Sequence, residues 1–327
     1  MKIISKSQIN SFKNFLDSHE TFLIAGHKEP DGDCISSSIG ISYILKHMNK
    51  PFKLLNAGPF KRTEIKKYAP LFKQETGFMT IEDQKACGLI IVDCSEISRL
   101  GEIDGPLKDF DAFIIDHHKT AVESENSIID ATSPAASCLV QQLFEQLVGT
   151  PDKEEAKTLF FGTATDTGFF RFLNESDKDV FTSVARLVEA GTSPREIYQD
   201  MTSGKGWNTR KLLGIMLTRA ERYLNGKLVI TYETQEDTRK YGQEGRDSDA
   251  LYTMMLCVEG VEAVVFVRQE TEHSCTIGFR SKDKVDVSVV ASKFGGGGHK
   301  NASGASTDGK IDTLIPSIVK EFSRIMS

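Results

Sequence analysis

The first half of the chain alternates short apolar runs with segments of helical spacing, and this alternation limits the fold more than any other feature. The apolar runs are TFLIAG (21–26), PFKLLNAG (51–58), CGLIIVDCSE (87–96) and DAFIIDHHKT (111–120). Apolar residues recur with helical spacing in residues 34–49, 133–149 and 153–168. In the second of these, Ser133 is expected to be the N-cap, with proline at the first helical position. Strands that alternate with helices predict an α/β fold on a parallel sheet.

The pattern changes after residue 192. Residues 193–225 contain two amphipathic stretches around the Gly-rich TSGKGWN, and we expect them to form a helical linker. From residue 226 onward, KLVITYET, VEAVVFVRQE and HSCTIGFRS have the composition of strands, and IDTLIPSIVKEFSRIM that of an amphipathic helix. We therefore expect a first domain at 1–192, the linker at 193–225, and a smaller α/β domain at 226–327.

Composition narrows the class of protein. No apolar run reaches the ~18 residues of a membrane span, and the start lacks the apolar core of a signal peptide, so a cytoplasmic protein is expected. The six cysteines form no C-x-x-C pair and are expected to be reduced thiols. A net charge of −6 argues against a protein that clamps long nucleic acid.

Four groups of Asp and His directly follow apolar runs. They are His27, Asp31 and Asp33 in GHKEPDGD, Asp93 in IVDCSE, Asp116, His117 and His118 in DHHKT, and Asp166 in TDTG. Each group alone could be a turn, a helix cap or a surface pair. Because the carboxyl ends of parallel strands lie along one edge of a sheet, we expect the four groups to converge there.

Converging carboxylates repel one another unless cations neutralise them. Carboxylate oxygens with one or two imidazoles suit Mn²⁺ or Mg²⁺ better than thiophilic metals. Two such ions can bind phosphate oxygens, supply a hydroxide nucleophile and stabilise a leaving oxygen. The pattern therefore predicts a two-metal phosphoesterase.

The four motifs, in this order, resemble those of the DHH phosphoesterase superfamily, which includes RecJ exonucleases, exopolyphosphatases and family II inorganic pyrophosphatases. FRS (279–281) and GGGGHKNASG (295–304) resemble the C-terminal DHHA-type domain of this superfamily. The chain is most similar to bacterial nanoRNases with pAp phosphatase activity and to dinucleotide phosphodiesterases. The resemblance implies an active-site cleft between a catalytic domain and a substrate-binding domain.

The resemblance also implies roles for the motif residues. Six side chains would hold two divalent cations, with Mn²⁺ the first choice and Mg²⁺ or Co²⁺ as alternatives: His27, Asp31, Asp33, Asp93, His117 and Asp166. The catalytic set would be Asp93, shared by both cations, Asp116, which orients the histidines, and His118, which faces the phosphate. Substrate contacts would come from Arg280, Ser281, Gly296, Gly297, Gly298, His299 and Lys300.

The residue types of the Gly-rich loop also favour phosphate binding on physical grounds. Glycines let the backbone approach a ligand and present N–H groups to phosphate, and an arginine can grip two phosphate oxygens. The competing interpretation is a flexible linker.

The expected activity is hydrolysis of phosphate esters in short 5′-phosphorylated oligoribonucleotides or dinucleotides and in pAp. A cyclic di-AMP phosphodiesterase is the alternative, and a catalytically inactive nucleotide-binding module is an alternative of another class. The expected partners are a small nucleotide or short RNA, with no long nucleic acid and no membrane; a homodimer stays open.

Overall fold

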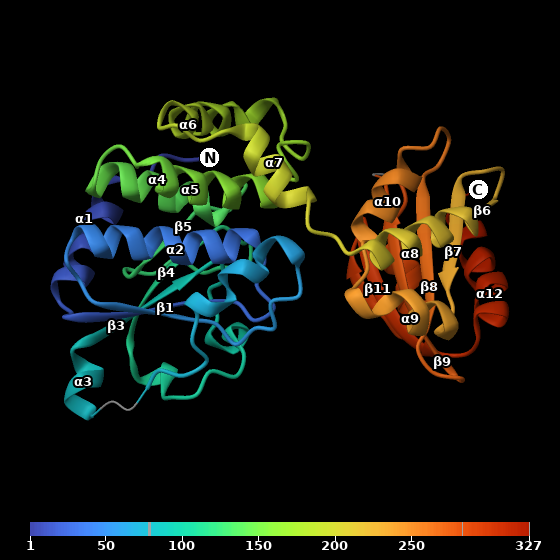
Figure 1. The fold of residues 1–327 in the computed structure, drawn as a ribbon, viewed down its shortest axis with the longest axis horizontal. Coiled ribbons are helices and arrows are strands. Elements are labelled where there is room, and N and C mark those ends of the chain that lie inside the picture. The colour runs from blue at the N-terminus through green and yellow to red at the C-terminus, as the bar shows by residue number, and fades with distance from the viewer. Residues whose placement is uncertain (78–79, 283, 327) are drawn as a thin grey trace. The chain divides into compact units, whose positions relative to one another are not determined.

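The computed structural model describes residues 1–77, 80–282 and 284–326 and divides the chain into two compact units, Met1–Gly204 and Lys205–Ser327 (Figure 1). Each unit has its own sheet and its own apolar core. In the part of the chain that the structure describes, no helix is long and apolar enough to cross a membrane.

The first unit is built on a five-stranded parallel sheet in the order β2-β1-β3-β4-β5. Its strands are β1 (Thr21–Gly26), β2 (Phe52–Leu55), β3 (Cys87–Val92), β4 (Asp111–Asp116) and β5 (Ser127–Ile129). β1 and β3 lie inside the sheet and are apolar on both faces, as central parallel strands must be. The predicted parallel α/β sheet is therefore confirmed, while the short β5 was not predicted.

Helices cover one face of this sheet more fully than the other. The helices of the first unit are α1 (Lys6–Asp17), α2 (Gly32–His47), α3 (Ile81–Lys85), α4 (Ala136–Leu147), α5 (Lys153–Asp166), α6 (Lys178–Glu189) and α7 (Pro194–Thr202). α2, α4 and α5 pack against one another above the sheet in Figure 1. Phe22 and Ile24 belong to the core on the helical side, whereas Leu23 and Ala25 pack on the other side. That second side is closed by 3₁₀ turns and loops that carry Leu100, Leu107 and Phe110 among others.

The start of α4 differs from the sequence prediction. We expected Ser133 as N-cap with a proline at the first helical position, but the N-cap is Ala135, and it makes no side-chain capping bond. Ser133 instead donates its hydroxyl hydrogen bond to the carbonyl of Ala135. The prediction was wrong because a residue distant in sequence, Asp33, caps this helix.

The second unit contains a mixed six-stranded sheet in the order β10-β11-β9-β8-β7-β6, in which β7 and β8 alone are parallel. Its strands are β6 (Glu221–Tyr223), β7 (Leu228–Glu233), β8 (Ala263–Gln269), β9 (Ser274–Ser281), β10 (Gly297–His299) and β11 (Ala302–Asp308). Its helices are α8 (Trp207–Thr218), α9 (Gln235–Tyr241), α10 (Ser248–Leu256), α11 (Val287–Lys293) and α12 (Ile311–Ser323). The predicted α/β character of this unit is confirmed.

The two faces of the second sheet carry different side chains. Cys275, Ile277 and Phe279 of β9 belong to the core that α11 and α12 cover. The alternate residues of the strand, among them Gly278 and Arg280, point to the opposite face, as strand geometry requires. The core that α8 and α10 form on that opposite face includes residues of β7 and β8, so part of β9 and β11 is left open there.

The expected helical linker at 193–225 contains two helices that belong to different units. α7 packs against α5, and its Ile197 is buried in the first core. α8 places Leu212 and Met216 in the core of the second unit. The division falls between Gly204 and Lys205, because the apolar side of each helix is buried in a different core.

Candidate active site

The acidic and histidine groups meet at the carboxyl edge of the first sheet. His27 follows β1, Asp93 follows β3, and Asp116 ends β4, with His117 and His118 directly after it. Asp31 and Asp33 lie at the N-terminus of α2, and Asp166 is the last residue of α5. The parallel sheet thus brings together residues that are far apart in the sequence.

His27 faces two carboxylates. Its Nε2 lies 3.4 Å from Asp93 Oδ2 and 3.8 Å from Asp31 Oδ1. Its Nδ1 lies 2.8 Å from the carbonyl oxygen of Lys28, to which it donates in the neutral ring. This backbone bond leaves the Nε2 lone pair directed at the cluster, as a metal ligand requires.

His117 makes the same arrangement on the other side of Asp93. Its Nε2 lies 3.3 Å from Asp93 Oδ1, 3.5 Å from Asp166 Oδ2 and 3.9 Å from Asp33 Oδ2. Its Nδ1 lies 3.2 Å from the carbonyl oxygen of Ser133. The two oxygens of Asp93 therefore face two different histidines, so this carboxylate stands between two groups of donors.

Asp116 supports the histidines and does not face the cluster centre. Its Oδ1 lies 2.7 Å from His118 Nδ1 and accepts hydrogen bonds from the backbone nitrogens of His117 and His118 at 2.7 and 3.2 Å. Its other oxygen is buried and has no hydrogen-bond partner among the described residues. The bond to Nδ1 fixes the ring of His118, whose side chain is 34% exposed.

The conformation of Asp93 is unusual for a residue with a side chain. Its φ of 58° lies in the left-handed region, which non-glycine residues rarely adopt. Such backbone strain persists only where surrounding structure enforces it, and it concentrates at functional sites. Here the backbone nitrogen of Asp93 donates to the carbonyl of Ile115 at 3.0 Å, which holds this conformation at the end of β3.

Burial makes the cluster electrostatically unfavourable without a cation. Burial together with the charges of Asp93 and Asp166 raises the pKa of Asp33 well above its usual value. Burial raises the pKa of Asp166 to about 6. Burial alone would lower the pKa of His117, but hydrogen bonding to Asp93 and nearby carboxylate charge raise it to about 10. The donor set therefore fits divalent cations, which remove the repulsion between buried carboxylates.

Three groups of donor atoms lie close enough to share an ion among the described residues. In each group the donor atoms are within 4.8 Å of one another: His27, Cys34 and Asp93; Asp93, His117 and His118; and Asp33, His117 and Asp166. Every cluster residue expected from the sequence is at the site. Cys34 and the N-terminal backbone of α4 were missed, because neither has a local sequence signal that distinguishes it from an ordinary buried thiol or helix start.

The residues expected to contact substrate in the second unit are not all in one place. Arg280 and Gly297 line a pocket of about 470 Å³ on the open face of the sheet, with Arg246, Tyr252 and Arg268. Ser281 is buried, and its hydroxyl donates to the carbonyl of Val285 at 2.6 Å, so it serves the internal structure of the unit. His299 and Lys300 are exposed and line neither this pocket nor the one described next.

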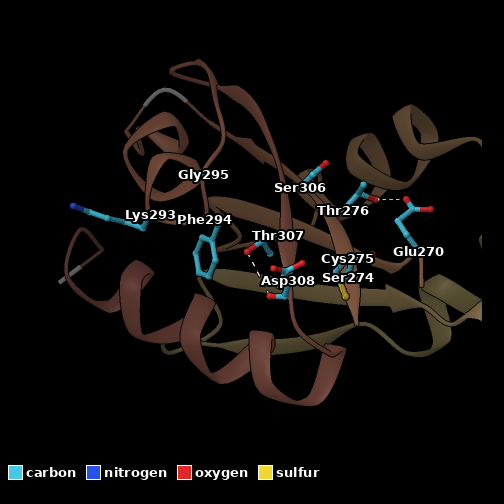
Figure 2. Close-up of a pocket in the computed structure, with 10 residues that line it drawn as sticks. All are labelled: Glu270, Ser274, Cys275, Thr276, Lys293, Phe294, Gly295, Ser306, Thr307 and Asp308. Atoms are coloured by element: carbon cyan, nitrogen blue, oxygen red, sulfur yellow. Dashed lines mark hydrogen bonds between the residues drawn. The ribbon is translucent and has the colours of Figure 1, made fainter. Parts of the chain in front are cut away.

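A second pocket of about 660 Å³ lies at the other end of the same strands (Figure 2). It carries the carboxylates of Glu270 and Asp308, and Glu270 accepts a hydrogen bond from Thr276. None of the substrate residues expected from the sequence lines it. Its two carboxylates make it less suited to phosphate than the pocket with three arginines.

Arg280 is the arginine of the first pocket that is available to a ligand. Arg246 pairs with the buried Glu233, and Arg268 pairs with Glu270. Among the described residues Arg280 has no carboxylate partner. Its Nη1 donates to the carbonyl of Phe279 at 2.9 Å, and its guanidinium lies 4.8 Å from the ring centre of Tyr252. Arg246, Tyr252 and Arg268 were not predicted from the sequence. They come from the loop before α10, from α10 and from β8, and they meet Arg280 of β9 only in the folded unit.

Comparison with known proteins identifies both units. The DHH family N-terminal domain matches residues 21–163, and the DHHA1 domain matches residues 225–327. A bifunctional oligoribonuclease and PAP phosphatase NrnA of Thermus thermophilus is 30% identical over 288 residues, which cover 88% of this chain and 84% of the relative. The cyclic-di-AMP phosphodiesterase PdeA of Listeria monocytogenes is 26% identical over 93% of this chain and 47% of its own length.

The fold is shared with a solved structure of similar length. An exopolyphosphatase-related protein from Bacteroides fragilis superposes with a TM-score of 0.81 at 22% identity and covers 98% of both chains. The family models and the Thermus relative confirm the family resemblance of the motifs. The order of the motifs, the convergence of their side chains and these matches lead to one conclusion. The chain belongs to the DHH family of phosphoesterases, with a DHH domain followed by a DHHA1 domain.

Proposed function

We propose that this protein hydrolyses phosphate esters in short 5′-phosphorylated oligoribonucleotides and dinucleotides, and in pAp. The observation that carries the proposal is the position of Asp93, whose two oxygens face His27 and His117 within 3.4 Å. The similarity to the Thermus oligoribonuclease and PAP phosphatase supports this choice of substrates.

In this proposal the protein holds two divalent cations, with Mn²⁺ preferred and Mg²⁺ or Co²⁺ as alternatives. His27, Asp31 and Asp93 would hold the first, and Asp33, Asp93, His117 and Asp166 the second. When bound, such ions supply electrostatic stabilisation of phosphoryl oxygens and an activated water. Solved structures that share the fold include an exonuclease RecJ bound to manganese.

His118 has a separate role. Because its Nδ1–H is held by Asp116, its Nε2 is the atom available to a substrate. We propose that Nε2, when protonated, donates a hydrogen bond to the phosphate and stabilises the charge that develops there. Asp116 is then a positioning residue, since it acts through His118.

In the second unit we propose that the pocket lined by Arg246, Arg268 and Arg280, here called the arginine pocket, binds a phosphate or a base of the nucleotide. Arg280 would make the charged contact with the nucleotide. Further polar contacts would come from the exposed end of β10, through the backbone of 296–298 and the side chains of His299 and Lys300. We also propose a cytoplasmic location, where such substrates arise. A homodimer remains a prediction.

The alternative substrate is cyclic di-AMP, which the name of the Listeria relative suggests. Incubation with Mn²⁺ and a panel of pAp, pApA, cyclic di-AMP and RNAs of increasing length separates the two proposals. Preferred turnover of pAp and pApA supports the first, and preferred turnover of cyclic di-AMP supports the alternative. Tight nucleotide binding with no turnover in any metal would identify an inactive binding module and refute both.

The assay needs variants of matched chemistry. Asp93→Ala is expected to abolish turnover of every substrate while the far-ultraviolet circular dichroism stays native. Asp17→Ala, which changes an exposed residue at the end of α1, is expected to have normal activity. Near-normal turnover by Asp93→Ala would show that the chemistry lies elsewhere.

A further inference from the structure

Cys34 lies beside two of the residues proposed to hold the first cation, His27 and Asp93. It is in the first turn of α2 and fully buried, and its Sγ, a His27 ring nitrogen and an Asp93 oxygen lie within 4.8 Å of one another. The absence of a side chain at Gly26 makes room for the sulfur, because a Cβ there would be 2.3 Å from Sγ. The end of β1 and the start of α2 therefore place a thiol beside the imidazole of His27.

One oxygen of Asp31 is already engaged in capping α2. Its Oδ1, which lies 3.8 Å from His27 Nε2, already accepts hydrogen bonds from the backbone nitrogens of Asp33 and Cys34, both at 3.1 Å. It is the N-cap of α2. In the three donor groups found among the described residues, Cys34 is present and Asp31 is not.

We propose that His27, Cys34 and Asp93 form a soft-metal site that binds Zn²⁺ or Cd²⁺ through the Cys34 sulfur. Thiolate and imidazole ligands favour such thiophilic ions, whereas Mn²⁺ and Mg²⁺ favour oxygen. As the sulfur–metal bond forms, the thiol proton passes to solvent. Because His27 and Asp93 also belong to the proposed Mn²⁺ set, a thiophilic ion and Mn²⁺ compete for this position.

The other buried cysteines do not have this environment. Cys138 Sγ lies 3.4 Å from the hydroxyl of Thr163, and Cys87 Sγ lies 3.9 Å from the carbonyl of Gly88. Cys34 Sγ also lies 3.9 Å from a carbonyl, that of His27, but it has the His27 ring and the Asp93 carboxylate beside it as well. Neither Cys138 nor Cys87 belongs to a group of three donors among the residues that the structure describes. A buried thiol is ordinarily a small apolar side chain, and these two fit that role.

Cadmium tests the site directly. The experiment uses the full chain with Cys257, which is exposed, replaced by Ser, so that this surface thiol does not bind added metal. Titration with Cd²⁺ is expected to give the ultraviolet charge-transfer absorption of one thiolate–cadmium bond. Cys34→Ala in this background is expected to abolish the absorption and to weaken Cd²⁺ binding at least about tenfold. A band of full strength in Cys34→Ala would overturn the proposal.

Cys94→Ala is the matched control. Cys94 is also fully buried and directly follows Asp93, but it is absent from the three donor groups of the described residues. The Cys94→Ala variant is expected to keep the Cd²⁺ band. If the band were lost in Cys94→Ala and kept in Cys34→Ala, the sulfur ligand would be Cys94 and the proposal would be overturned. Binding of Mn²⁺, measured from the electron paramagnetic resonance of the free ion, is expected to survive in Cys34→Ala.

A second measurement needs no change at Cys34. Cadmium NMR of the Cys257→Ser chain is expected to place the resonance in the range of sulfur-ligated ions, and a resonance in the oxygen and nitrogen range would overturn the proposal. The inference does not depend on the proposed substrates. A chain that binds Cd²⁺ through Cys34 but hydrolyses nothing would refute the proposed function and leave this site standing.

Discussion

The carboxylate of Asp33 caps α4, with Oδ2 2.6 Å from the backbone nitrogen of Ala136. Its other oxygen accepts from the next backbone nitrogen, that of Ser137, at 2.9 Å. One buried side chain thus joins the start of α2 to the start of α4 and also faces His117. The partial positive charge of a helix N-terminus favours a carboxylate here, which offsets part of the repulsion from Asp93 and Asp166.

Replacing this carboxylate is expected to affect both metal binding and folding. Asp33→Asn keeps the size but turns an amide toward one of the two backbone N–H groups, so one capping bond is lost. We expect hydrolysis to be abolished and the metal-free protein to lose roughly 0.5–2 kcal/mol of stability, as for other lost caps. Urea unfolding in EDTA and a turnover assay check the two effects separately. Near-normal turnover would show that Asp33 holds no cation.

His118 and Asp116 are expected to act as one unit. His118→Gln should lower kcat by about 100-fold or more, because it removes the proposed hydrogen-bond donor to the phosphate. Asp116→Asn should lower kcat because it disturbs the ring that Asp116 holds. In the double variant the two losses should not add. Fully additive losses in this double-mutant cycle would contradict a role of Asp116 through His118.

Gly32 is expected to be required for the spacing of α2 and α5. A Cβ at this position would lie 2.4 Å from Thr165 Oγ1. Gly32 directly precedes Asp33 in the sequence, and Thr165 directly precedes Asp166. Gly32→Ala should therefore cost roughly 1–3 kcal/mol of stability and reduce activity. Thr165→Ala in the same chain should restore part of both losses.

The helical Gly214 provides the matched control for this substitution. A Cβ there has no neighbour within 4 Å. Gly214→Ala should leave activity unchanged and stabilise the protein by up to about 1 kcal/mol, because alanine favours the helix. Equal effects of both substitutions, measured by thermal unfolding, would contradict the close packing of α2 on α5.

Metal removal is expected to destabilise the protein more as pH rises. Burial raises the pKa of Asp166 from 3.8 to about 6. The metal-free protein therefore loses stability at this group as pH rises from 3.8 to about 6. The pKa values of His27 and His117 are raised from 6.5 to about 10 against the opposing effect of burial, so their contribution is full below pH 6.5 and is lost toward pH 10. Bound Mn²⁺ would neutralise the carboxylates in place of the protons on these groups.

The difference in Tm between Mn²⁺-loaded and EDTA-treated protein should therefore grow from pH 6 to pH 9. Differential scanning calorimetry at a series of pH values measures it. Asp93→Ala should show no Mn²⁺-dependent shift at any pH. A difference that shrinks as pH rises would contradict the assignment of these groups to the cation site.

Arg280 is expected to contribute binding and not chemistry. Arg280→Ala should raise KM for the nucleotide by roughly tenfold or more with little change in kcat, because a charge-assisted hydrogen bond to phosphate is lost. Arg324→Ala, which removes an exposed arginine paired with Glu321, should leave both constants unchanged. An unchanged KM in Arg280→Ala would exclude the arginine pocket as a substrate site.

Much of the fold and most of the cluster could be predicted from local pattern. The apolar runs at 21–26, 87–96 and 111–120 contain β1, β3 and β4, because central parallel strands must be apolar on both faces; β3 ends at Val92 and β4 at Asp116. The short β5 and the N-cap of α4 could not be predicted in this way. β5 has three residues and joins the sheet through β4, and α4 is capped by a residue about a hundred positions away.

The sequence by itself determined which chemical groups this protein has and that parallel strand ends would assemble them, because residue type and periodicity are local properties. Only the tertiary structure decided which contacts each of these groups makes. It placed Asp116 behind His118, engaged Asp31 and Asp33 in helix caps, and brought the sulfur of Cys34 to His27. These roles depend on distances between segments that meet only after folding, and no spacing along the chain contains them.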